Sequence, residues 1–249
     1  MLSSQRKQTI LALLAQEKQV QSRELSQRFG LSEDSIRRDL RELAAEGLLQ
    51  RVHGGALPVS AALATFETRK SVQTASKQVI AQKAVSLIQP GQIVLIDGGT
   101  TSAELVRRLP ATLSFTAVTH SPSVALALAD HPLVEIILIG GQLYKHSVVT
   151  VGAAMLESIN RINADLFFMG VTGVHPAAGL TTGNFEEATV KRALAGRAAE
   201  TVVLASAEKL NSASAFAIGS LSLASTLVVE TQPDEALQLA LSQQGVTII

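Results

Sequence analysis

The stretch Ser32-Glu33-Asp34-Ser35-Ile36-Arg37-Arg38-Asp39-Leu40-Arg41-Glu42-Leu43 predicts a helix with one buried face and one basic face. Ser32 offers an N-cap hydroxyl, and the two carboxylates after it favour the positive end of the helix dipole. Three apolar residues recur at helical spacing, namely Ile36, Leu40 and Leu43. At about 100° per residue, Arg38 falls almost opposite this stripe. A helix of this kind suits the major groove of DNA.

Two further helices and a glycine-tipped hairpin flank this helix in the sequence. Apolar residues at helical spacing predict the first of them, at Ile10, Leu13 and Leu14. The second begins after Ser22 and ends at Gly30, because glycine adopts the left-handed conformation without steric cost. Residues 48–58 have the pattern of a strand, a glycine turn and a second strand. We therefore expect residues 1–58 to form a small helical domain with a two-stranded wing.

The candidate DNA contacts are hydroxyls near the helix starts and basic side chains of the third helix and the wing. They are Ser22, Ser32, Ser35, Arg37, Arg38, Arg41, Arg51 and His53. Arginine binds phosphates or the acceptor atoms of guanine, and a wing touches the backbone or the minor groove. The alternative is an ordinary surface helix whose charges pair with one another, for example Asp34 with Arg38.

The rest of the chain has the pattern of an α/β domain. Residues 59–76 are rich in Ala, Ser and Thr and lack a strong apolar period, which indicates a linker. From 77 to 249, helical segments alternate with apolar strands, predicted at 93–97, 115–119, 134–139, 166–170, 201–205 and 227–229. Near-continuous apolar strands of this kind predict a mostly parallel sheet covered by helices on both faces.

One strand end has the composition of an anion site. The loop Asp97-Gly98-Gly99-Thr100-Thr101-Ser102 follows the first of these strands and leads into a helix expected to start near Ala103. Glycines admit an anion close to the backbone, hydroxyls donate to it, and a helix N-terminus supplies free N–H groups. The loop lacks the lysine of a Walker motif and the third glycine of a dinucleotide fingerprint. A tight strand-to-helix turn with a capping threonine is the structural alternative.

Both halves of the chain resemble the DeoR family of transcriptional regulators. The N-terminal match is Ser35-Ile36-Arg37-Arg38-Asp39-Leu40, Glu42-Leu43 and Arg51-Val52-His53-Gly54-Gly55-Ala56. The match in residues 77 to about 230 consists of Asp97-Gly98-Gly99-Thr100-Thr101, Val118-Thr119-His120-Ser121, Gly140-Gly141, Val151-Gly152, Ala164-Asp165, Gly179-Leu180-Thr181, Glu187, Val190-Lys191-Arg192 and Lys209. The resemblance implies a winged helix-turn-helix joined to a sensor domain that is similar to ribose-5-phosphate isomerases.

The resemblance also implies a phosphorylated sugar or a related metabolite as effector. Its phosphate would lie in the loop 97–101, and Lys209 would contact the ligand. The effector contacts are expected from Asp97, Gly98, Gly99, Thr100, Thr101, Thr119, Ser121, Glu187 and Lys209. Three matched residues have a structural interpretation that we favour: Lys191 and Arg192 as solvated helix residues, and Asp165 as the cap of a strand entry.

Departures from the family pattern bear on activity and ligand class. His120 stands in place of an amide, as a neutral histidine expected at the edge of the site, and Ser206-Ala207-Glu208 replaces the usual segment before Lys209. Thr172 replaces a carboxylate. Because an aldose–ketose isomerase needs a carboxylate base, its loss fits a domain that binds a sugar phosphate without converting it. No catalytic residue, metal site or cofactor is predicted.

Composition narrows the choice of function and compartment. Up to Leu57 there are nine basic and seven acidic side chains, a charge of +2 that leaves −2 for the remainder. This weak asymmetry means that DNA affinity depends on the placement of a few arginines and on paired half-sites, so a homo-oligomer, dimer or tetramer, is expected. The absence of cysteine, of a signal peptide and of a membrane-length apolar run favours a soluble cytoplasmic protein.

The leading hypothesis is a repressor of a carbohydrate-metabolism operon that its effector releases from operator DNA. The first alternative is an isomerase-like enzyme with a fused regulatory domain. A second alternative, a general single-strand-binding protein, is disfavoured because the chain has one tyrosine, no tryptophan and few aromatic residues for stacking bases.

Overall fold

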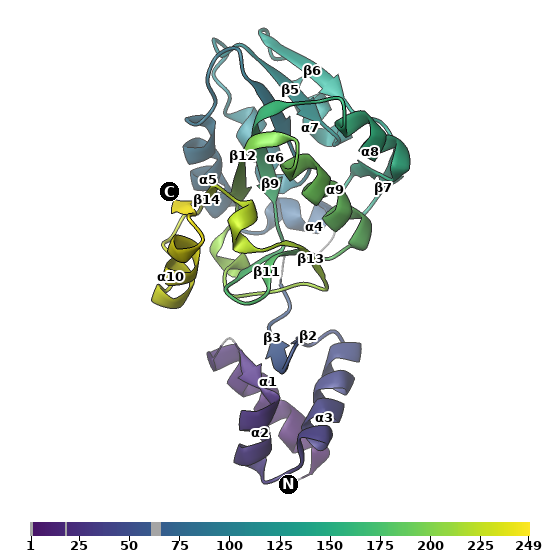
Figure 1. Cartoon of the computed structure of the whole chain (residues 1–249), viewed down its shortest axis with the longest axis vertical. Helices are drawn as coiled ribbons and strands as arrows, with labels where there is room; N and C mark the ends of the chain where they lie inside the picture. Colours follow the sequence, from purple (N-terminus) through teal and green to yellow (C-terminus); the bar gives the residue numbers. More distant parts are fainter. Residues whose placement is uncertain (1, 18, 61–65) are drawn as a thin grey trace.

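The computed structural model describes residues 2–17, 19–60 and 66–249. These form a small helical domain at the N-terminus and a larger α/β domain, and the two are joined by the chain that leaves the wing (Figure 1). The predicted fold class is confirmed in both parts. Among the described residues, no helix is long and apolar enough to cross a bilayer.

The N-terminal domain has three helices and a three-stranded sheet. The helices are α1 (Ser3–Glu17), α2 (Ser22–Phe29) and α3 (Glu33–Ala45). The strands are β1 (Val20–Gln21), β2 (Gln50–Val52) and β3 (Gly55–Leu57), in the order β1-β3-β2. Strand β2 and strand β3 are the predicted wing, whereas β1 was not predicted because two residues leave no periodicity to detect.

Local sequence signals set the boundaries of α2 and α3. Gly30 ends α2 with φ of 64°, and its N–H and that of the next residue bond to carbonyls of the last turn. The Ser32 side chain accepts a hydrogen bond from the N–H of Ser35, as an N-cap does. The apolar residues of α1 and α3 that were expected to face inward are all buried, at Ile10, Leu13, Leu14, Ile36, Leu40 and Leu43.

One charged residue of α3 belongs to the interior of this domain. Asp39 is 3% exposed, and its carboxylate binds Arg6 of α1 at 2.5 Å (Nε to Oδ2) and 3.0 Å. This ion pair fixes α1 against α3. The other polar residues of α3 face solvent, so the opposite face of the helix stays open.

The larger domain is built on a seven-stranded parallel sheet in the order β15-β14-β12-β9-β4-β5-β6. Its strands are β4 (Ile93–Ile96), β5 (Phe115–Thr119), β6 (Val134–Leu138), β9 (Ala164–Gly170), β12 (Ala198–Leu204), β14 (Thr226–Val228) and β15 (Thr247–Ile248). Six of these strands match predicted ones to within a few residues, and β15 was missed.

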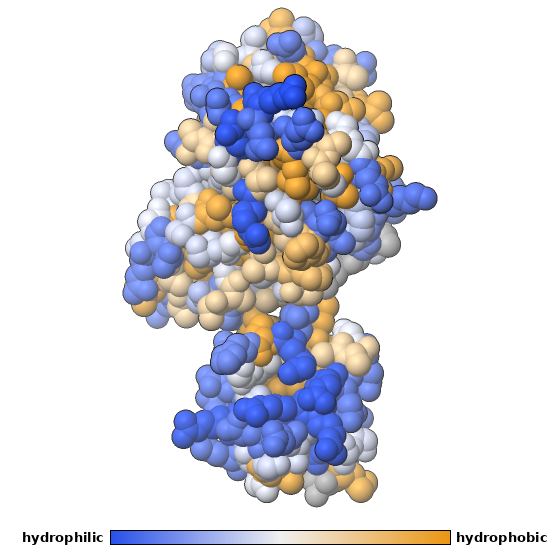
Figure 2. Space-filling view, turned by 45° about the vertical axis from the view of Figure 1, so that its right-hand side comes forward, coloured by the Kyte–Doolittle hydropathy of each residue, from blue (hydrophilic) through white to orange (hydrophobic). Residues whose placement is uncertain are grey.

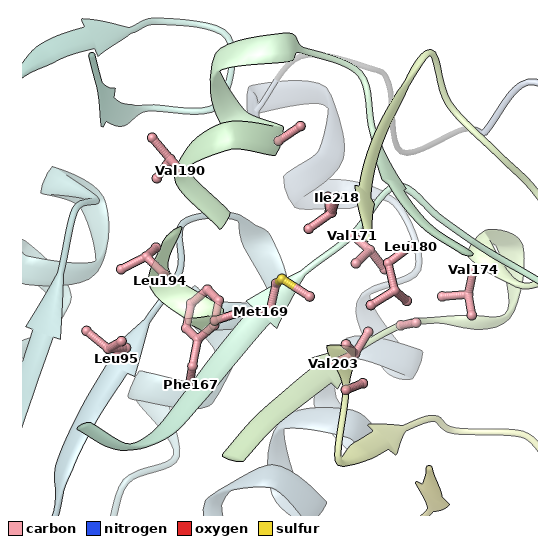
Figure 3. Close-up of a cluster of buried hydrophobic side chains, with 14 of the residues drawn as sticks. Leu95, Phe167, Met169, Val171, Val174, Leu180, Val190, Leu194, Val203 and Ile218 are labelled. Atoms are coloured by element: carbon pink, nitrogen blue, oxygen red, sulfur yellow. The ribbon is translucent and has the colours of Figure 1, made fainter. Parts of the chain in front are cut away.

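Helices cover both faces of the sheet, as near-continuous apolar strands require. On one face lie α5 (Thr74–Val85), α6 (Thr100–Arg107) and α7 (Pro122–Leu128), packed against a cluster that includes Val94, Ile96 and Phe168. On the other lie α8 (Ala153–Ile159), α9 (Phe185–Ala195) and α10 (Glu235–Gln243). Figure 3 shows this second core, in which Leu95 and Phe167 of neighbouring strands lie below Leu194 of α9.

Several short elements surround the carboxyl end of the sheet, and none of them was predicted. A hairpin consists of β7 (Gln142–Tyr144) and β8 (Val149–Val151). A small antiparallel sheet contains β10 (Gly173–His175), β11 (Gly179–Thr182) and β13 (Phe216–Gly219). The turns η2 (Ala207–Lys209) and η3 (Leu221–Leu223) complete this region.

The stretch 59–76 that was interpreted as a linker contains ordered elements. Helix α4 (Phe66–Ser71) lies within it, and α5 begins at Thr74, before residue 77. The Phe66 side chain is buried, and the Lys77 ammonium donates to the carbonyls of Arg69 and Val72. Residues 61–65 of this stretch lie outside the described residues. The short helix was missed because six residues carry no helical period.

Candidate DNA interface and anion pocket

The basic face of the N-terminal domain consists of α3 and the wing. Arg38 and Arg41 are exposed on α3, and Arg51 and His53 are exposed on the wing. Figure 2 shows hydrophilic side chains gathered on the side of this domain where Figure 1 places α3. The side chains of Arg38 and Arg41 have no hydrogen-bond or ion-pair partner in the described parts of the chain, so both are available for a ligand.

Arg37 has a different environment from its neighbour. Its guanidinium pairs with Glu33 at 2.8 Å and with Asp34 at 3.3 Å. Asp34, the alternative partner of Arg38, therefore pairs with Arg37 instead. Such exposed helix pairs contribute only a few tenths of a kcal/mol, about 0.3–0.5, and DNA phosphates can displace them. The hydroxyls of Ser32 and Ser35 lie at the start of the same helix, 3.0 Å apart.

A cavity separates α3 from the wing. Arg37, Leu40, Arg51 and His53 line it, together with Ser22, which is buried at the start of α2. The N–H of Ser22 donates to the carbonyl of Gly54 at 2.7 Å, which fixes the wing tip to α2. Seven of the eight candidate DNA contacts therefore lie on α3, on the wing or at the α3 cap. The eighth, Ser22, holds the wing tip through its main-chain N–H.

The α/β domain has a pocket of about 170 Å³ at the carboxyl end of its parallel strands. The loop after β4 and the first turn of α6 form one wall. The chain after β9, the β7–β8 hairpin, α9, η2 and α4 form the others. The lining residues are Arg69, Gly98, Gly99, Thr100, Thr101, Ser102, Tyr144, His146, Ser147, Gly170, Val171, Thr172, Thr182, Gly183, Glu187, Lys191 and Lys209.

The glycine loop at this pocket requires glycine for two separate reasons. A Cβ on Gly98 would lie 2.2 Å from a methyl carbon of Val149. Gly99 has φ of 116°, which side-chain-bearing residues rarely adopt. Helix α6 then begins at Thr100, earlier than expected, so the N–H groups of its first residues face no carbonyl of an earlier turn. This helix start with its two threonine side chains has the geometry of an anion site.

Asp97 lies beneath the pocket, where it organises the residues above it. Its carboxylate is fully buried and accepts from the N–H groups of Gly98 and Gly170 at 2.8 Å, from His120 Nε2 at 2.9 Å, and from the Lys191 ammonium. Burial alone would raise the pKa of Asp97, but Lys191 and His120 outweigh it and hold that pKa well below its usual value. Because internal donors occupy both oxygens, Asp97 does not line the pocket.

Two other predicted effector contacts are also below the surface of the pocket. Thr119 donates to the carbonyl of Ile96 at 2.6 Å, and Ser121 donates to the carbonyl of Val148 at 3.1 Å. His120 is 1% exposed and bonds to Asp97 and to the carbonyl of Thr150, so it lies under the site and not at its edge. The end of β5 and the two residues after it therefore lie beneath the glycine loop.

Three cations converge on the pocket from three different elements. Lys191 comes from α9, Lys209 from η2 and Arg69 from α4. The pKa of Lys209 is lowered to about 8, chiefly by burial and also by the charges of Arg69, Lys77 and Lys191, against the opposing effect of Glu208. Burial likewise lowers the pKa of Arg69. The side chains of all three cations line the same pocket.

The interpretation of Lys191 as a solvated residue was wrong, since its side chain is buried against Asp97. Arg192 is exposed, yet its guanidinium donates to the carbonyls of Ala217 and Ile218 at 2.8 Å each and so holds β13. The interpretation of Asp165 is confirmed, because its carboxylate accepts from the N–H of Ile93, the first residue of β4, at 2.7 Å.

Sequence reasoning missed the pocket residues that come from the unpredicted elements. These are Arg69 of α4, Tyr144, His146 and Ser147 of the hairpin region, Thr182 at the end of β11 and Gly183 after it. Thr172, noted for its lack of a carboxylate, lines the pocket with its hydroxyl held by Ser214 Oγ at 2.6 Å. Glu187 adds the single lining carboxylate at the start of α9, where Asn184 caps the helix.

Family models match both domains of the chain. The model of the DeoR-like helix-turn-helix domain matches residues 6–61, and that of the DeoR C-terminal sensor domain matches residues 72–231. A winged reading domain beside a small-molecule pocket defines a DNA-binding transcriptional regulator with a sensor domain. The chain belongs to the DeoR family.

Relatives of known name match over the full length. The HTH-type transcriptional regulator GlpR of Haloferax volcanii is 33% identical over 100% of this chain and 98% of its own. The glycerol-3-phosphate regulon repressor of Escherichia coli K12 is 29% identical, with 100% and 99% covered. The HTH-type transcriptional repressor GlcR of Bacillus subtilis is 28% identical, with 100% and 96% covered.

Solved structures are similar to parts of the chain. Ribose 5-phosphate isomerase A of Methanocaldococcus jannaschii is 19% identical, with 54% of this chain and 53% of that chain covered and a TM-score of 0.40. The eIF2B beta chain of Chaetomium thermophilum is 15% identical, with 69% and 54% covered and a TM-score of 0.49.

Proposed function

We propose that this regulator represses a carbohydrate-metabolism operon and is released from its operator by a phosphorylated sugar or a related phosphate ester. The observation that carries the proposal is the surplus of positive charge at the α6 N-terminus: among the described lining residues Arg69, Lys191 and Lys209 face one carboxylate, Glu187, and the buried Asp97 offsets only one further charge. A phosphate dianion would neutralise this surplus and accept from the free N–H groups of the helix. Relatives named as repressors of a glycerol-3-phosphate regulon and as GlcR support the same output.

The two ends of the pocket suit the two ends of such a ligand. Main-chain N–H groups of residues 99–102 would hold the phosphate, with Lys209 and Lys191 beside it, because the N–H of Gly98 already donates to Asp97. Glu187 accepts hydrogen bonds only, so it would bind hydroxyls of the sugar part. Release from DNA then requires that the ligand bind one arrangement of the two domains more tightly than the other, and DNA must weaken ligand binding by the same factor.

Thermal stabilisation of the purified full-length protein tests the effector class. A phosphorylated ligand that prefers the folded state raises the melting temperature by mass action. We expect glycerol 3-phosphate or a hexose phosphate to raise it, and the same compounds without phosphate to have no effect. The second half of the test uses a duplex that the protein selects from random DNA. Loss of binding to that duplex when the stabilising compound is added would support repression, and unchanged binding would contradict it.

We also propose that the pocket binds without turnover. Thr172 stands where an isomerase-like site would need a carboxylate, and its hydroxyl is engaged with Ser214. Incubation of the protein with ribose 5-phosphate, followed by assay for the ketose, tests this point. Conversion that disappears in Lys209→Ala would favour the enzyme alternative.

Pairing of two chains on DNA completes the proposal. One winged domain offers few contacts, so a symmetric dimer or tetramer would place two reading helices on paired half-sites. Light scattering with and without the selected duplex measures the number of chains. Because the DNA target lies inside the cell, the cytoplasm is the compartment that we propose.

A further inference from the structure

Arg69 joins the anion pocket to the segment that follows the wing. It lies on α4, within the stretch between the DNA-binding domain and the sheet, and yet it lines the pocket beside Lys191 and Lys209. Its Nε atom is buried and has no hydrogen-bond partner within the described residues. Buried N–H groups are nearly always paired, so an unpaired guanidinium nitrogen at the wall of a cationic pocket indicates an absent acceptor.

Hydrogen bonds to neighbouring elements hold the two ends of α4. The N–H of Phe66 donates to the carbonyl of His146 at 3.2 Å, and Lys77 holds the carbonyls of Arg69 and Val72 at the other end. A second cavity, of about 200 Å³, lies between α4 and α6 and is lined by residues that include Phe66, Lys70 and Glu104. Because this space is not filled by side chains, α4 can shift against α6 without displacing a packed core.

The chain that leaves the wing also contacts the loop between η2 and β13. Val59 forms a bridge with Ala213, next to Ser214. The Ser214 hydroxyl bonds to Thr172, which lines the pocket. Val59 is therefore connected through Ala213 and Ser214 to a residue that lines the pocket, and Arg69 lines the pocket itself.

We propose that Arg69 is the residue through which a bound anion acts on the DNA-binding domain. The anion pairs with the Arg69 guanidinium, draws α4 onto the α6 N-terminus, and so changes the position of the chain that leads to the wing. This inference rests on the proposed function, because it takes the pocket to be the effector site. It adds that α4 transmits the effect of anion binding out of the pocket.

Hydrogen exchange of the full-length protein separates anion binding from its effect on α4. The probes are inorganic phosphate and glycerol 3-phosphate, at constant ionic strength. Exchange of the N–H groups at the start of α6 reports binding, and exchange within α4 reports the response. In the wild type we expect several-fold slowing at both segments. In Arg69→Met at saturating probe we expect slowing at α6 and none at α4. Lys70→Met is the matched control, because this cation of the same helix pairs with Glu67 and does not line the anion pocket.

Each outcome decides the inference. Slowing at α6 without slowing at α4 in the wild type would overturn it and leave the effector site standing. Slowing of α4 in Arg69→Met that equals the wild type would also overturn it. No slowing at either segment with any phosphorylated probe would overturn both the inference and the proposed effector site. If the probe slows exchange at neither segment of Arg69→Met, this result supports contact between the anion and Arg69. Exchange of α4 in the wild type, with and without the probe, then decides whether anion binding affects α4.

DNA binding gives an independent measurement. We expect Arg69→Met to bind the selected duplex with wild-type affinity and to lose most of its release by glycerol 3-phosphate, while Lys70→Met is released normally. Equal release of both variants would contradict the inference.

Discussion

The Lys191 ammonium donates to the Asp97 carboxylate across 94 positions of sequence, and so ties α9 to the end of β4. The pair is almost completely buried, with side-chain exposures of 6% and 0%. Asp97 also receives the N–H groups of Gly98 and Gly170 and the His120 ring, so one carboxylate fixes three walls of the pocket. The pocket above it is pre-organised by this interaction.

Removal of the charge on Asp97 should destabilise the α/β domain. Asp97→Asn leaves the Lys191 ammonium buried without its partner, which costs about 3–5 kcal/mol in comparable pairs. Urea unfolding followed by circular dichroism measures the free energy of the sensor-domain transition. The control is Glu157→Gln, whose exposed pair with Arg161 contributes little. Equal unfolding midpoints for the two variants would contradict the structural role of Asp97.

The same carboxylate predicts a direction for acid unfolding. The pKa of Asp97 is lower in the folded protein than in the unfolded chain, so its stabilising effect is complete above the unfolded value and is lost as the pH falls below it. We expect the wild type to lose more stability than Asp97→Asn between pH 5 and pH 3. Parallel loss in both proteins would show that other groups govern acid unfolding.

Local signals in the sequence predicted the elements, and long-range contacts decided which side chains meet. Gly30 and Ser32 mark helix ends through their own backbone chemistry, so α2 and α3 were located from sequence. The glycine loop was likewise located from sequence, and its role as an anion site stays a prediction. Lys191 and Arg69 could not be placed, because their roles depend on where α9 and α4 pack.

The polar residues after the strands illustrate the same limit. A strand end predicts that Asp97, Thr119 and Ser121 lie at the correct edge of the sheet, and they do. It does not tell whether a side chain points up into the pocket or down into the hydrogen bonds beneath it. Here all three point to internal partners, such as the carbonyl of Ile96 for Thr119.

Arg38→Ala should reduce discrimination among DNA sequences. Its exposed, unpaired guanidinium lies on α3 opposite the buried stripe, and loss of a bidentate contact to a base costs about 1–3 kcal/mol. Competition between the selected duplex and random DNA measures the ratio of the two affinities. As a control, Arg28→Ala removes an arginine of α2 that pairs with Glu17. An unchanged ratio in Arg38→Ala would remove this residue from the reading face.

Thr100→Ala should leave DNA binding intact and blunt release by the effector. The Thr100 side chain is largely buried at the first position of α6 and lines the pocket, far in sequence from the reading helix. Loss of one hydrogen bond to a charged phosphate costs about 1.5–3 kcal/mol, so roughly tenfold or more effector should be needed for release. Thr189→Ala is the control, because that hydroxyl bonds to the carbonyl of Phe185 outside the pocket. Equal effector sensitivity in both variants would exclude Thr100 from the phosphate site.

The affinity for a phosphate ester should fall as the pH rises above about 8. The pKa of Lys209 is lowered from 10.5 to about 8, chiefly by burial, and a bound dianion would raise it, so binding takes up a proton above that pH. When one proton is linked, affinity weakens by up to roughly tenfold for each pH unit. Phosphate monoesters have a second pKa of about 6, so the ligand's own charge is constant over this range. Calorimetric titration with glycerol 3-phosphate from pH 7.5 to pH 9.5 measures the slope.

Lys209→Met isolates the contribution of this lysine to that slope. Because its side chain does not ionise, the variant should bind more weakly and with an affinity that changes little between pH 7.5 and pH 9.5. In the absence of ligand the effect of pH is opposite: the affinity for the ligand falls as the pH rises, whereas the stability contributed through Lys209 increases. The unfolded chain binds the Lys209 proton more tightly than the folded one, so the wild type should gain stability relative to the variant as the pH rises from 8 toward 10.5. Parallel binding profiles in the two proteins would mean that Lys209 does not hold the phosphate, whereas a steep profile confined to the wild type would place its ammonium against the anion.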